Sequence, residues 1–222
     1  MPMREILHAL PMLLLVLGAC STPEPESCAS GDRAGSEGRY RDAIDLETRC
    51  LASADLAAAT KMRAFEVRAW AFYKSGDFRN AADDQMAFVR LDPAPSHRTL
   101  INLSLYMRKA GRLDESLEAA RSAEKQDKQP NIMTQYHLGW TFAEMGRHEE
   151  AVTAFTRGIT VQPDYAWIYW RRGLSYEHLG RRDEAREDFR KADALVKRKP
   201  ADEDSILMVP HLKAKVSEYG IS

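Results

Sequence analysis

Little in this sequence points to catalysis, metal binding or nucleic acid. Basic and acidic side chains nearly balance, and the formal net charge is -1. This balance argues against a nucleic acid partner, because neutralising phosphates requires a basic face. The six histidines include no pair at metal-ligand spacing, and the chain has no catalytic serine motif and no phosphate-binding glycine loop. We therefore expect no metal, no cofactor and no enzyme activity, and keep as the alternative an active site assembled from scattered residues.

A long hydrophobic run is also missing. The most apolar stretch extends from Ile6 to Leu17 and is interrupted by His8 and Pro11. It is shorter than the roughly 20 apolar residues that a membrane-spanning helix needs. Its length suits the core of a signal peptide. Residues 1–19 are therefore expected to be a signal peptide, and the rest of the chain to be exported.

The end of this segment reads Leu17-Gly18-Ala19-Cys20. It resembles the lipobox of bacterial lipoproteins, in which small residues precede a cysteine. The resemblance implies that Cys20 carries a lipid anchor in the membrane, and that Ser21 favours the outer membrane, facing the periplasm. The alternative is a plain secretory signal that is cleaved near Ala19.

Only two cysteines follow Cys20. Residues 20–27 are polar and contain proline, so they are expected to form an extended tether. Cys28 and Cys50 come next, and an exported chain meets an oxidising compartment in which paired cysteines usually form disulfides. We expect a Cys28–Cys50 disulfide, with two buried free thiols as the alternative.

One pattern recurs along the remainder of the chain. Similar segments begin at Gly38, Gly76, Gly111, Gly146 and Gly180, which are 38, 35, 35 and 34 residues apart. Each glycine is followed five residues later by alanine or serine, and helix-like segments flank it on both sides. A fixed period of this size predicts an α-solenoid built from helix pairs.

The two best-defined units begin at Ile132 and Ala166. The first carries Gly139, Phe142, Gly146, Ala151, Phe155, Gly158 and Pro163, and the second carries Gly173, Tyr176, Gly180, Ala185, Phe189 and Ala192. This pattern resembles the tetratricopeptide repeat, with weaker units from Met62 and His97 and a degenerate first unit over residues 24–53. The resemblance implies an all-α solenoid of antiparallel helix pairs, about five units over residues 28–199. A loop and a capping helix are expected over residues 200–222.

In this repeat, as the resemblance implies, the first helix of each unit lines a concave groove. The matching positions of this chain include all four tryptophans, and an exposed aromatic strip usually marks an interaction site. The expected groove residues are Trp70, Tyr73, Ile101, Leu105, Tyr136, Trp140, Trp167 and Trp170. The alternative is that the C-terminal segment Ile206–Val209 folds back and covers this strip.

Together these features suggest an envelope-anchored adaptor that holds a protein or peptide partner in its groove. Arg108 and Lys109 lie beside the strip and could pair with an acidic group on a ligand. The Lys/Asn pattern that clamps terminal carboxylates in chaperone-binding members of the family is absent. The rivals are a binder of cell-wall glycan, because aromatic strips also stack on sugars, an enzyme with an unrecognised site, and a self-assembly module. The sequence leaves the oligomeric state open.

Overall fold

The computed structural model describes residues 25–199 and 203–221, and all regular secondary structure in these residues is α-helical. These residues form eleven helices: α1 (Glu26–Ser36), α2 (Tyr40–Leu51), α3 (Ala58–Lys74), α4 (Phe78–Leu91), α5 (His97–Lys109), α6 (Leu113–Glu124), α7 (Ile132–Glu144), α8 (His148–Val161), α9 (Ala166–His178), α10 (Arg182–Arg198) and α11 (Glu203–Glu218). The all-α prediction is confirmed.

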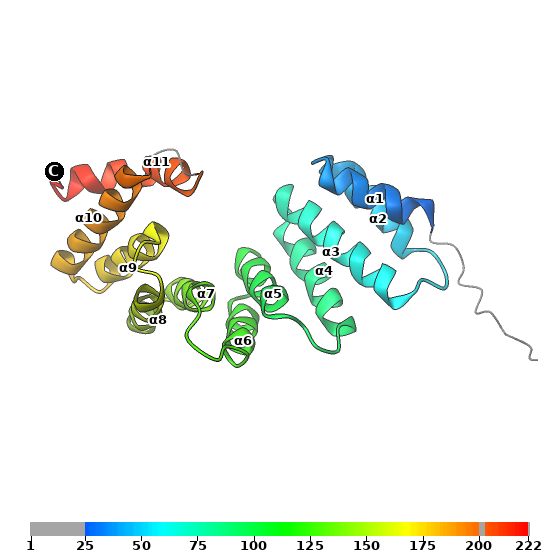
Figure 1. The fold of residues 1–222 in the computed structure, drawn as a ribbon, viewed down its shortest axis with the longest axis horizontal. Coiled ribbons are helices and arrows are strands. Elements are labelled where there is room, and N and C mark those ends of the chain that lie inside the picture. Colours follow the sequence, from blue (N-terminus) through cyan, green and yellow to red (C-terminus); the bar gives the residue numbers. More distant parts are fainter. Residues whose placement is uncertain (1–24, 200–202, 222) are drawn as a thin grey trace, which may run out of the picture.

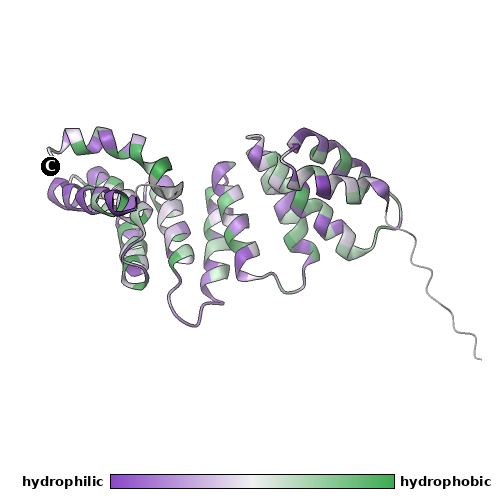
Figure 2. Ribbon diagram, turned by 45° about the horizontal axis from the view of Figure 1, so that its top comes forward, coloured by the Kyte–Doolittle hydropathy of each residue, from purple (hydrophilic) through white to green (hydrophobic). Residues whose placement is uncertain are grey.

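The first ten helices pack as five antiparallel pairs, from α1 with α2 to α9 with α10. The pairs follow one another in an arc, with α1 and α2 at one end and α10 and α11 at the other (Figure 1). Hydrophobic and hydrophilic residues are interleaved along the helices (Figure 2), as expected when each helix has one packed face and one solvated face. The predicted unit starts at His97, Ile132 and Ala166 are the first residues of α5, α7 and α9.

The recurring glycines make the tight turns inside the pairs. Gly146 and Gly180 have φ angles of 75° and 71°, in the left-handed region that side chains with a Cβ avoid. After each of them the next amide bonds back into the first helix, as Arg147 N–H does to the carbonyl of Phe142 at 2.9 Å. The regular spacing of these glycines therefore marks where the first helix of each pair ends.

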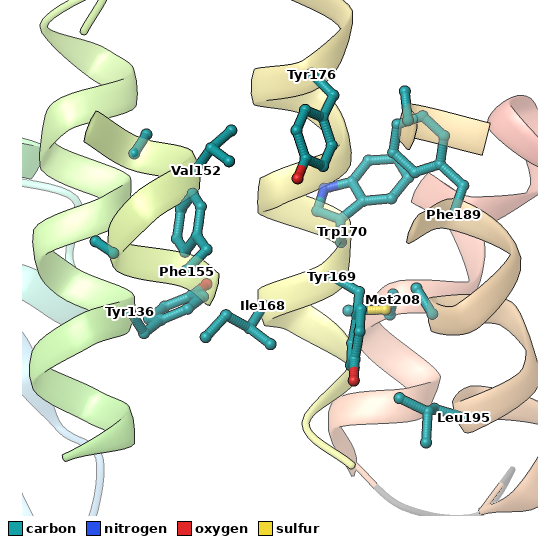
Figure 3. Packing of buried hydrophobic residues seen from close by; sticks show 14 of the residues in the cluster. Tyr136, Val152, Phe155, Ile168, Tyr169, Trp170, Tyr176, Phe189, Leu195 and Met208 are labelled. Atoms are coloured by element: carbon teal, nitrogen blue, oxygen red, sulfur yellow. The ribbon is translucent and has the colours of Figure 1, made fainter. Parts of the chain in front are cut away.

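Small residues inside the pairs make room for aromatic rings. A Cβ atom on Gly139 would lie 2.6 Å from the ring of Phe155, and one on Gly173 would lie 2.7 Å from the ring of Phe189. Both phenylalanines are fully buried. Adjacent units also pack closely: a Cβ atom on Gly158 of α8 would clash with Cδ1 of Ile168 on α9, and Figure 3 shows Ile168 beside Tyr136 of α7.

An arginine–aspartate staple, which the sequence analysis did not anticipate, ties α9 to α10. Arg172 donates two hydrogen bonds to the carboxylate of Asp188, at 2.8 and 2.7 Å, and a third to Thr156 of the preceding pair at 2.9 Å. Burial raises the pKa of Asp188 despite the hydrogen bonds from Arg172. The same arrangement occurs in the second pair, with Arg68, Asp84 and Thr48.

The first pair is closed by a disulfide. Cys28 of α1 and Cys50 of α2 are bonded, and their Cα atoms are 4.9 Å apart. Because α1 begins at Glu26, the last two residues of the expected tether, Glu26 and Ser27, are helical, which corrects the boundary at residue 27.

Helix α11 closes the other end of the array. It is longer than the expected capping helix and continues through Pro210, because packing against α10 outweighs the one backbone hydrogen bond that proline cannot make. Met208 and Leu212 are buried, whereas Ile206 and Leu207 are more than half exposed. Figure 3 shows the Met208 side chain beside Tyr169.

Candidate functional site

The eight predicted groove residues separate into three groups by burial. Trp70 is 43% exposed, and Tyr73, Leu105, Trp140 and Trp167 are partly buried. Ile101, Tyr136 and Trp170 are buried at 7%, 6% and 8% exposure. The expectation that all eight line one open strip is therefore corrected, because these three side chains belong to the packed interior.

Trp170 illustrates the correction. Its ring lies 5.2 Å from that of Phe189 and 6.1 Å from that of His211 on α11, and Figure 3 shows it turned toward Phe189. The C-terminal helix, and not an open groove, thus provides part of its surroundings. Trp140 and Trp170 therefore do not both belong to the exposed strip that the sequence analysis expected.

Trp140 has a different environment, between two arginines. The guanidinium carbon of Arg108 on α5 lies 3.4 Å from the centroid of the Trp140 ring, and that of Arg171 on α9 lies 3.5 Å from it. Both distances are well inside the range of about 6 Å for cation–π contacts. Three consecutive first helices therefore contribute one side chain each to a stack, called here the Arg–Trp–Arg stack (Arg108, Trp140 and Arg171).

Arg108 is a buried charge. Its residue is 3% exposed, and its Nε and Nη2 atoms have no hydrogen-bond partner. Burial, together with a smaller effect of the like charge of Arg171, lowers its pKa to about 10, although the Glu144 carboxylate acts in the opposite direction. The guanidinium is thus still protonated near neutral pH.

Among residues 25–199 and 203–221, one carboxylate adjoins the stack. Glu144 accepts a hydrogen bond of 2.7 Å from the indole nitrogen of Trp140, and its carboxylate lies 3.8 Å from Nη1 of Arg108. The latter distance is too long for a hydrogen bond. Lys109 adds a further cation, with Nζ 5.7 Å from the Trp140 ring, and burial lowers its pKa. The cluster therefore has more positive than negative charge.

A cleft of about 170 Å³ opens beside the stack. Its lining includes Trp140, Glu144 and Arg171, together with Ser175. Two more lining residues, His148 and His178, stack in parallel with ring centroids 4.3 Å apart. Burial lowers the pKa of His148, and His178 lowers it further.

The cluster continues toward the N-terminal pairs through aromatic side chains. Lys109 also lies 5.7 Å from the ring of Phe78. Phe78 contacts Tyr73, which stacks on both Trp70 and Tyr106 with centroid separations of 5.9 and 5.0 Å. A line of basic and aromatic groups thus runs from Trp70 on α3 to Arg171 on α9.

The sequence analysis found part of this cluster. Trp140 was predicted, and Arg108 and Lys109 were placed beside the strip. Arg171 was missed, because it lies one position after Trp170 and is not one of the expected groove residues. The histidine pair was missed because its members are 30 residues apart and meet only when α8 and α9 pack.

Other polar clusters are weaker candidates for a functional site. In residues 25–199 and 203–221, no three histidine, cysteine or acidic side chains gather in a way that could hold a metal ion. His97 and Asp127 both contact the hydroxyl of Thr134, at 2.7 Å each, but Thr134 is fully buried and no substrate could reach it.

No helix in the described part of the chain combines the length and apolar character needed to cross a membrane. Cys20 and the signal segment lie outside the described residues.

Comparisons with known proteins agree with the geometry. Residues 139–180 match the model of the TPR repeat, and residues 168–195 match that of the tetratricopeptide repeat. A crystal structure of MamA superimposes with a TM-score of 0.64 and 24% identity, covering 78% of this chain and 97% of that one. YrrB, described as a TPR protein with an unusual peptide-binding site, gives a TM-score of 0.62 and 16% identity, covering 84% and 92%. At these identities the structures show a shared fold. No curated protein sequence matches this chain.

Proposed function

We propose that this tetratricopeptide-repeat protein is a scaffold that is tethered to a bacterial envelope membrane and holds a segment of a protein partner against α3, α5, α7 and α9. The observation that carries the proposal is the Arg–Trp–Arg stack with its line of aromatic neighbours. Tryptophan and arginine are among the residue types that most often dominate the binding energy at protein interfaces.

Folding alone does not account for this line of residues. The arc is held together by buried small residues and by rings such as Phe155 and Phe189, which are fully buried. Trp70, by contrast, leaves 43% of its surface exposed on α3. A large ring that contributes little to packing inside the chain is available to a partner.

The envelope location rests on the sequence of the first 20 residues. Replacing Cys20 by serine removes the thiol that would receive the lipid, so Cys20→Ser is expected to release the protein from membranes or to block its processing. More than one acyl chain would be needed for stable anchoring. Fractionation and intact mass measure the effect, and a variant that stays in the membrane with wild-type mass would contradict the lipoprotein proposal.

Binding at this surface is tested with Trp70→Ala. Because Trp70 is exposed, we expect the free energy of unfolding to fall by about 1 kcal/mol or less. We expect partner capture to weaken by about 2 kcal/mol, as truncation of an aromatic anchor often does. The measurement is crosslinked affinity purification from native membranes, paired with thermal unfolding of the same variant.

Val161→Ala is the matched control. Val161 is similarly exposed, at 44%, but ends α8, a second helix of its pair. Partner capture should be unaffected by Val161→Ala. Equal capture by wild type and Trp70→Ala would remove α3 from the binding surface, and retention on peptidoglycan in place of a protein would favour the glycan-binding alternative.

A further inference from the structure

We infer that the Arg–Trp–Arg stack is a subsite for an acidic side chain, aspartate or glutamate, within an extended segment of the partner. This inference rests on the proposed function, because it names the chemistry of the ligand at that surface. Such a subsite requires three things: a local excess of positive charge, polar groups without a hydrogen-bond partner inside the chain, and access for a ligand.

The excess charge comes from three cations around one ring. Arg108 and Arg171 lie within 3.5 Å of the Trp140 ring centroid, and Lys109 lies 5.7 Å from it. Glu144 is the one acidic group that the structure places against the stack among the described residues. Like charges this close repel one another, and a ligand carboxylate would relieve the repulsion.

The unsatisfied groups are guanidinium nitrogens. Nε and Nη2 of Arg108 and Nε of Arg171 are buried without a hydrogen-bond partner. Glu144 approaches Arg108 only to 3.8 Å. A buried charge without full pairing is costly, and apolar residues of similar size are often neutral or stabilising in its place. Stability therefore does not explain why an arginine occupies this position, whereas recognition of an anion does.

A ligand can reach the subsite from the cleft. Arg171 is partly exposed and lines the cleft, and Lys109 is exposed, with Nζ 5.7 Å from the Trp140 ring. In this arrangement Arg171 and Lys109 donate to the incoming carboxylate, while Arg108 contributes its charge from beneath the Trp140 ring. Glu144 lines the same cleft and lies 3.8 Å from Nη1 of Arg108, so it competes with the ligand for these cations.

The subsite lies partway along the line of residues. Trp70 and Tyr73 continue that line on the α3 side, and Leu174 continues it on α9. A segment that crosses the stack would extend past it in both directions. This position favours an internal acidic side chain over the carboxylate at a chain end.

The test uses two synthetic peptides and the full chain purified in detergent. One is a fluorescein-labelled peptide of alternating aspartate and phenylalanine, blocked at both ends, and the other has asparagine in place of aspartate. Fluorescence anisotropy should show about tenfold tighter binding of the aspartate peptide, a difference that falls as salt is added. Arg171→Gln should weaken binding of the aspartate peptide about tenfold.

Two further variants sharpen the result. Glu144→Gln removes the competing carboxylate and should strengthen binding of the aspartate peptide several-fold. Lys191→Gln makes the same charge change as Arg171→Gln at an exposed position on α10, and should have no effect. A third peptide, with asparagine side chains and a free C-terminal carboxylate, should bind no better than the blocked asparagine peptide.

Several outcomes would overturn the inference. These are equal affinity for the aspartate and asparagine peptides, loss of affinity in Glu144→Gln, stronger binding of the peptide with the free carboxylate, and no binding of the aspartate peptide up to about 1 mM. If one of these occurs while Trp70→Ala still weakens partner capture, the scaffold function stands and only the acidic subsite is lost.

Discussion

Asp188→Ala is expected to reduce the free energy of unfolding by about 3–5 kcal/mol, because it leaves the Arg172 guanidinium buried without its partner. The Asp188 side chain is 4% exposed and that of Arg172 is 16% exposed, so water cannot replace the lost carboxylate well. Urea denaturation, followed by circular dichroism and by tryptophan fluorescence, measures the loss.

The matched control for Asp188→Ala copies residues from the preceding repeat unit. One unit earlier, the positions of Arg172 and Asp188 hold Leu138 and Ala154, both buried. The double variant Arg172→Leu with Asp188→Ala copies this apolar pair into the last unit. Replacing both members of a buried ion pair by apolar groups is often neutral or stabilising, so we expect stability close to that of the wild type.

The comparison of single and double variants decides what the staple does. A single variant within about 1 kcal/mol of wild type would mean that water reaches Arg172 after all. A double variant as unstable as the single one would mean that the geometry of the ion pair, and not avoidance of an unpaired charge, holds α9 to α10.

The periodic parts of the fold could be predicted from sequence because they depend on local chemistry. The turn glycines with positive φ fix where one helix of a pair ends and the next begins, and Gly139 and Gly173 fix how closely the helices approach. The start of α3 was less well predicted. It lies at Ala58, four residues before the expected Met62, because the alanines before Met62 are good helix formers that no repeat position requires.

The site was only partly predictable because it depends on packing between units. Repeat position correctly placed Trp140 on a first helix, but could not show that Arg108 and Arg171 from the neighbouring helices cover its two sides. Nor could it show that Trp170 is buried, since that depends on Phe189 and on His211 of α11. Contacts between residues about 20 to 40 positions apart leave no local signal in a single sequence.

His137 gives the chain a specific weakness toward acid. It lies on α7 at 5% exposure, and its Nδ1 atom has no hydrogen-bond partner. Burial, with a smaller contribution from the charge of Arg108, lowers its pKa from 6.5 to about 3. Because the pKa is lower in the folded state, the unfolded chain binds more protons between these two values. Stability therefore falls as the pH drops through this range.

The expected loss between pH 7 and pH 5 is about 2 kcal/mol from this residue alone. His137→Leu removes the group, so the free energy of unfolding of this variant should depend less on pH by about that amount. His211→Gln, at an exposed histidine on α11, is the matched control. Urea denaturation at pH 7, 6 and 5 gives the three slopes. If wild type and His137→Leu lose stability in parallel, His137 takes up a proton in the folded state, and the interior beside Arg108 is more hydrated than the burial of both residues indicates.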